Sequence, residues 1–169
     1  MSQSLPTLNG SNFVEIIQEC ESKLAEFVKK NDGVVNESIV ANFIFSYLHN
    51  SYFKEMKFPK IIGTEISRET QNPCEHCDNT RFIHDLVLLD KNQGKYLYDL
   101  VLEIKVYHNH PLYESHEKKI ECDIQHVSDT NNGVCLIVNV GGVKMQIDQL
   151  EKIQDTANSK SVTLVVFNI

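Results

Sequence analysis

The chain has 169 residues, 41% of them hydrophobic and 23% charged, a composition typical of one globular domain rather than a disordered or fibrous protein. Sixteen Lys and Arg against 23 Asp and Glu give a formal net charge of −7, which argues against a general nucleic-acid coat protein, since such proteins are basic. Five cysteines at scattered positions indicate a reducing compartment rather than a disulfide framework.

Residues 1–11 read as a polar leader, and residues 12–169 as a single domain. The leader lacks the basic and apolar segments of a signal peptide. No apolar run approaches the roughly 18 residues that a membrane-spanning helix needs. We therefore expect a cytoplasmic protein that does not enter membranes.

The predicted elements follow from hydrophobic spacing and from the turn residues between them. In chain order, these patterns predict helices over residues 12–30 and 36–51, strands over 58–67, 81–89 and 96–107, a helix over 113–127, a strand over 133–140, a helix over 144–156 and a strand over 161–169. This order indicates an α/β fold in which helices flank a central mixed sheet.

Charged side chains interrupt two of the predicted strands. Asp85 lies in the strand 81–89, in which apolar residues occupy both faces, as in a central strand: Phe82, Ile83, Leu86, Val87, Leu88 and Leu89. Glu103 and Lys105 lie in the strand 96–107 and share one face, because side chains alternate along a strand. A buried carboxylate is costly unless it is neutralised, paired or bound to a metal ion, so Asp85 needs an explanation.

Asp85 and Glu103 are placed to meet across these two strands. In an antiparallel pair with an even register sum, the two residues lie on one face of the sheet, because both numbers are odd. Directly opposed residues have Cβ atoms about 4.5–5.5 Å apart, which allows two carboxylates to hold one Mg²⁺ or Mn²⁺ ion. Lys105, two residues further on, would then reach an attacking water or a scissile phosphate.

Asp85, seventeen intervening residues and then Glu103-Ile104-Lys105 resemble the D…(D/E)xK signature of the restriction-endonuclease-like, or PD-(D/E)xK, nuclease superfamily. The resemblance implies an αβββαβ core over residues 36–140, with an extra N-terminal helix and a C-terminal helix and strand. It implies that residues 12–169 form a single nuclease-like domain. The implied activity is metal-dependent hydrolysis of phosphodiester bonds, in DNA ahead of RNA.

The resemblance also implies roles for individual residues. Asp85 and Glu103 would bind Mg²⁺ or Mn²⁺, and Lys105 would assist the attacking water. An acidic residue from an earlier element often joins such a site, and Glu37 and Glu65 are the two candidates. Some members place a glutamine on the helix after the lysine strand, where this chain has Gln125.

The chain departs from the family pattern at one position and leaves other interpretations open. His84 stands where the signature has proline. The three charged residues also fit a structural ion pair, and the same fold also serves as a catalytically inactive binding or assembly module. If the protein cuts both strands of a duplex, its small size favours a homodimer with two sites.

Two further groups of residues are candidate sites with weaker support. Cys74 and Cys77 are spaced as half of a zinc site, but a second pair of ligands is missing from the sequence pattern. His108 and His110 follow the Glu103 strand and could touch a phosphate, although histidines at a strand end more often have a purely structural role.

Overall fold

The computed structural model describes residues 10–53, 60–69, 81–92, 95–108, 114–128, 130, 132–141 and 147–169. Its elements are α1 (Gly10–Lys30), α2 (Glu37–Leu48), a π-helical turn (His49–Phe53), β1 (Lys60–Glu69), β2 (Arg81–Asn92), β3 (Lys95–His108), α3 (Glu114–Ser128), β4 (Gly133–Val140), α4 (Ile147–Ser159) and β5 (Thr163–Asn168). Every element expected from the sequence is present in the expected order. No helix in these ranges is long and apolar enough to cross a membrane.

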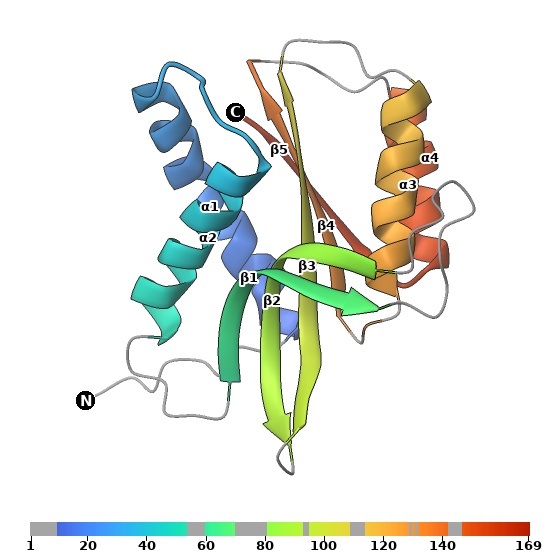
Figure 1. Ribbon diagram of the computed structural model, residues 1–169. Coiled ribbons are helices and arrows are strands. Elements are labelled where there is room, and N and C mark those ends of the chain that lie inside the picture. Colours follow the sequence, from blue (N-terminus) through green and yellow to red (C-terminus); the bar gives the residue numbers. More distant parts are fainter. Residues whose placement is uncertain are drawn as a thin grey trace.

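The five strands form one mixed sheet in the order β1-β2-β3-β4-β5. β2 runs antiparallel to β1 and to β3, whereas β3, β4 and β5 run parallel to one another. Figure 1 shows α1 and α2 on one face of the sheet and α3 and α4 on the other. The prediction of an α/β fold with a central mixed sheet flanked by helices is therefore confirmed.

Alternation along β3 builds two hydrophobic cores. Its even-numbered residues, such as Leu102 and Ile104, are buried against the helices α1 and α2. The odd-numbered Val101 is buried against α3 and α4. Glu103 and Lys105 continue this odd-numbered face, so the fold directs both side chains toward the α3 side of the sheet.

β2 stops pairing with β3 next to Asp85. The two strands pair from Asn92↔Lys95 to Leu86↔Leu102, and no pair follows beyond Leu86. β2 continues to pair with β1, through Ile66↔His84, and curves toward α3 (Figure 1). The bend lies where β1 carries Glu65, whose φ of 53° is left-handed and interrupts the pairing opposite Asp85.

The N-terminus of α2 is fixed by a cap directly before Glu37. Asn36 has an extended backbone, and its side-chain oxygen accepts a 2.9 Å hydrogen bond from the amide of Ile39. This satisfies one of the amides that lack a partner at the start of a helix. The cap holds Glu37 in the first turn, where the helix dipole favours a carboxylate.

Replacing Asn36 with Ala should lower the free energy of unfolding by about 1 kcal/mol, because the Ile39 amide loses its acceptor. Urea denaturation followed by circular dichroism measures the change. Asn36→Ser is the matched control, because serine also caps helices and should retain most of the stability. Equal losses for the two variants would show that the cap does not stabilise α2.

Candidate functional site

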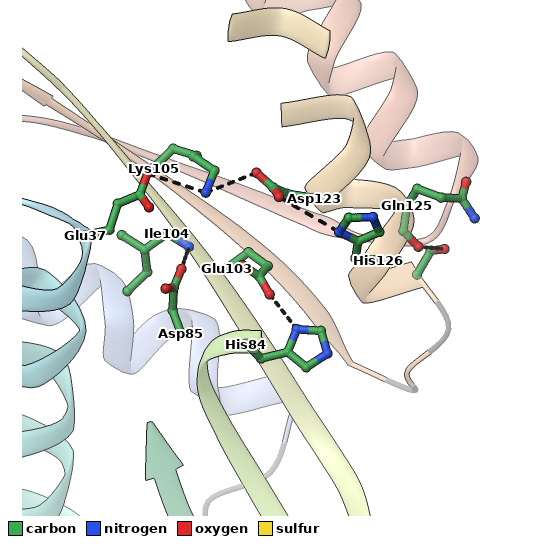
Figure 2. A network of polar contacts seen from close by, with 10 residues as sticks. Glu37, His84, Asp85, Glu103, Ile104, Lys105, Asp123, Gln125 and His126 are labelled. Atoms are coloured by element: carbon green, nitrogen blue, oxygen red, sulfur yellow. Dashed lines mark hydrogen bonds and ion pairs between the residues drawn. The ribbon is translucent and has the colours of Figure 1, made fainter. Parts of the chain in front are cut away.

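A cavity of about 980 Å³ opens where β2 departs from β3. The strands contribute Asp85 from β2 and Glu103 and Lys105 from β3, while α2 contributes Glu37 and α3 contributes Asp123. Figure 2 shows these side chains gathered between the sheet and the two helices. The structure thus brings the three residues of the sequence motif to one cavity, together with two further carboxylates.

The side chain of Asp85 supplies β3 with a hydrogen-bond acceptor where the backbone of β2 no longer does. Its Oδ2 accepts a 2.7 Å hydrogen bond from the backbone amide of Ile104, at the point where β2 no longer pairs with β3. Burial raises the pKa of Asp85 above its ordinary value, although this hydrogen bond and the charge of Lys105 counteract part of the effect. The fold therefore accommodates the carboxyl group of Asp85 because β2 and β3 separate at this point, so Asp85 does not lie in a strand that is paired on both sides.

Glu103 is the most enclosed carboxyl group of the cavity, with 7% of its side chain exposed. Its Oε1 is in hydrogen-bond contact with Nδ1 of His84, which is itself buried. Burial raises the pKa of Glu103 well above the usual range, and the negative charges of Asp85 and Asp123 raise it further. The cavity consequently disfavours full ionisation of its carboxyl groups unless additional positive charge is present.

Lys105 connects the two helical layers through ion pairs. Its Nζ lies 3.4 Å from Oε1 of Glu37 on α2 and 3.3 Å from Oδ2 of Asp123 on α3. Burial alone lowers the pKa of Lys105, but Asp123, Glu37, Glu103 and Asp85 together raise it above its ordinary value. The lysine is therefore held in its charged form at neutral pH.

Asp123 is a member of the cluster that the sequence did not single out. Burial raises the pKa of Asp123 to about 6, against the lowering effect of the nearby Lys105 charge. Its Oδ1 lies 4.0 Å from Nδ1 of His126, one turn further along α3. Asp123 thus connects the charged centre to the imidazole of His126.

The remaining predicted residues fall in different places. Glu65 is exposed and does not belong to the described lining of the cavity, so the structure does not bring it to the cluster. Gln125 points away from Lys105 (Figure 2). Nε2 of His108 makes a 2.7 Å hydrogen bond with the backbone oxygen of Val35, although His108 also lines the cavity.

Three of the predicted candidates lie outside the described residues. They are Cys74, Cys77 and His110. The interpretations that rest on them, a zinc site and a phosphate contact, stay predictions.

Carboxyl groups predominate in the cluster around Lys105. Asp85, Glu103, Asp123 and Glu37 all act on the single ammonium of Lys105, so negative groups outnumber positive ones unless carboxyls protonate. Oxygen donors of this kind are the ligands that Mg²⁺ and Mn²⁺ prefer. Across the described ranges, however, no three His, Cys, Asp or Glu side chains are already grouped as metal ligands.

The fold and the cavity together define the class of this protein as a mixed α/β domain with an acidic, lysine-containing site at the opening of its sheet. Comparison with known protein families, with curated proteins and with solved structures finds no match to this chain. Its function must therefore be argued from the site.

Proposed function

We propose that the protein is a divalent-cation-dependent nuclease that hydrolyses phosphodiester bonds in nucleic acid, with DNA as the expected substrate. The observation that carries the proposal is the meeting of Asp85, Glu103 and Lys105 in one cavity, although they come from two strands. The described helix–strand order α2-β1-β2-β3-α3-β4 also agrees with the αβββαβ core that the sequence resemblance implies.

Each residue of the motif has a role that its surroundings support. Asp85 and Glu103 would hold Mg²⁺ or Mn²⁺, which supplies a water of lowered pKa and offsets charge on the phosphate when it is bound. Glu37 is a supplementary ligand candidate because it lines the same cavity. Lys105, with its raised pKa, orients the attacking water and stabilises negative charge on the phosphate rather than acting as a base.

Glu103→Gln should reduce nucleic-acid cleavage at least about a hundredfold, because the amide removes one anionic ligand while it preserves the shape of the side chain. Linear and plasmid DNA are incubated with the protein in Mg²⁺, in Mn²⁺ and in EDTA, and products are resolved on gels. Cleavage by the wild type should disappear in EDTA.

Glu65→Gln is the matched control, since Glu65 is exposed and does not belong to the described lining of the cavity. This variant should cut like the wild type. Equal activity of Glu103→Gln and the wild type would show that the site assignment is wrong, and an RNA substrate in parallel reactions decides between DNA and RNA.

The second candidate function is a catalytically inactive binding or assembly module. The contact between Glu103 and His84 favours it, because this contact engages an oxygen of Glu103 that would otherwise bind the metal ion. Calorimetry with Mg²⁺ and Mn²⁺ separates the two candidates, because the module predicts no binding and no change in stability. A homodimer, which the cutting of both strands of a duplex would favour, is tested in the same preparation by analytical ultracentrifugation.

A further inference from the structure

Two pairs of rings line the cavity at opposite ends of the carboxyl cluster. Phe82 of β2 stacks on His126 of α3 with ring centroids 3.3 Å apart, and Tyr107 of β3 lies 5.2 Å from His116 of α3. The histidines are ten residues apart on α3 (126 − 116 = 10), or about 15 Å along the helix axis. Asp123 lies between them, so the ring pairs flank the charged centre.

An exposed apolar side chain extends one of these ring pairs. Ile83, next to Phe82, also lines the cavity, and 65% of it is exposed. Val34 is the other large hydrophobic residue that is exposed to this degree in the described part of the chain. The cavity therefore exposes an apolar side chain to solvent next to charged ones. Such a surface suits a ligand that has both apolar faces and charged groups.

Charged side chains line the cavity both at its rim and in its interior. Lys118 and Lys119 on α3 line the cavity and are exposed, whereas Glu103 and Asp123 show only 7% and 16% of their side chains to solvent. Exposed ammonium groups at a rim attract a phosphate backbone. The carboxyl groups of Glu103 and Asp123 lie deeper, where they oppose entry of a phosphate unless a cation accompanies it.

Building on the proposed function, we infer that the substrate is single-stranded nucleic acid, with bases stacking at Phe82 and Tyr107 while the backbone follows the lysine rim. In a duplex, both faces of each base are covered by neighbouring bases, so a protein ring can stack only on a base that is unpaired and splayed out. A single strand also requires only one site for each cut, so the activity does not depend on a homodimer.

Fluorescence anisotropy tests the inference without requiring cleavage. Labelled single-stranded DNA, single-stranded RNA and a duplex, each about 12 nucleotides long, are titrated with the full chain in Ca²⁺ and in EDTA. We expect at least one single strand to bind about tenfold or more tightly than the duplex. Phe82→Leu and Tyr107→Leu should each weaken single-strand binding about tenfold, because each removes one stacking ring.

Two further variants separate loss of binding from loss of folding. Ile83→Glu alters an exposed side chain, so the protein should fold normally, and we expect single-strand binding to weaken about tenfold through lost apolar contact and added negative charge. Tyr47→Leu is the matched control, because Tyr47 lies under Lys23 on the other face of the sheet and away from the cavity. This control should bind like the wild type.

The outcomes distinguish the inference from the proposed function. Duplex binding that equals single-strand binding, or unchanged single-strand binding in both Phe82→Leu and Ile83→Glu, overturns the inference even if the protein cleaves DNA. Selective single-strand binding without cleavage in Mg²⁺ or Mn²⁺ supports the inferred surface and overturns the nuclease activity alone.

Discussion

Replacing Lys105 with Met should lower the free energy of unfolding by about 3 kcal/mol near neutral pH, measured by urea denaturation in EDTA. The variant keeps the aliphatic volume but removes the ammonium that lies 3.4 Å from Glu37 and 3.3 Å from Asp123. Asp123 and Glu103, whose side chains are only 16% and 7% exposed, then remain together without a compensating charge, which is far more costly than the loss of an exposed ion pair.

Lys152→Met is the matched control for this substitution. Lys152 pairs with Glu117 at 3.4 Å and Glu121 at 3.8 Å, but 59% of its side chain is exposed. Exposed pairs of this kind contribute about 0–1 kcal/mol, so this variant should remain close to the wild type. A similar decrease in the free energy of unfolding in the two lysine variants would mean that the charge of Lys105 does not stabilise the buried carboxyl groups around it.

The free energy of unfolding of the wild type in EDTA should rise as the pH falls from about 8 to about 5. Burial raises the pKa of Asp123 to about 6 in the folded protein, from an ordinary value of 3.8. Between these values the folded state binds more protons than the unfolded state, so stability falls as the pH rises through this interval. A shift of this size corresponds to about 3 kcal/mol for Asp123, and Asp85 and Glu103 shift in the same direction.

Asp123→Asn should flatten this pH profile, because the amide carries no proton to release. The informative quantity is the difference between the wild-type and variant slopes across a series of urea denaturation curves. Carboxyls that do not interact with Asp123 contribute equally to both proteins, and Glu103, whose pKa the charge of Asp123 raises, adds to the difference in the same direction. Parallel profiles would show that Asp123 ionises in the fold at an ordinary pH. A wild-type protein that loses stability on acidification would contradict the clustering of buried carboxyls altogether.

Local sequence patterns account for much of the fold. The continuous apolar run at 133–140 coincides with β4 (Gly133–Val140), because a central parallel strand is buried on both faces and leaves an unambiguous pattern. The even register sum assumed for β2 and β3 holds next to Asp85, whereas the register shifts between Leu88 and Leu89. Leu86 pairs with Leu102, an even sum, so the same register extended by one step sets Asp85 opposite Glu103.

The sequence did not reveal the geometry that opens the site. The strand 81–89 predicts a continuous central strand, but pairing with β3 stops at Leu86 because β2 bends away with β1. Nothing in the local pattern marks Glu65 as left-handed, since that conformation is rare for any residue other than glycine, asparagine or aspartate. The resemblance made Glu65 a ligand candidate, whereas the structure places it at the irregularity of β1 opposite Asp85.

Asp123 and His84 were missed for a different reason. Asp123 lies on α3 among several charged residues, and helical spacing alone does not tell which of them faces the sheet. The orientation depends on how α3 lies across β3 and β4, a long-range property. His84 was considered only as a departure from the proline of the family pattern, whereas its ring makes the closest contact to Glu103.

The packing of α1 against β5 has a consequence for how the chain matures during synthesis. α1 and β5 lie at opposite ends of the colour bar in Figure 1 yet touch in space, and the Asn168 amide donates a 3.2 Å hydrogen bond to Glu21 Oε1 across 147 positions. Because synthesis runs from the N-terminus, α1 leaves the ribosome before β5 does. The apolar stripe containing Phe13, Ile17 and Leu24 therefore completes its packing only after β5 has been synthesised.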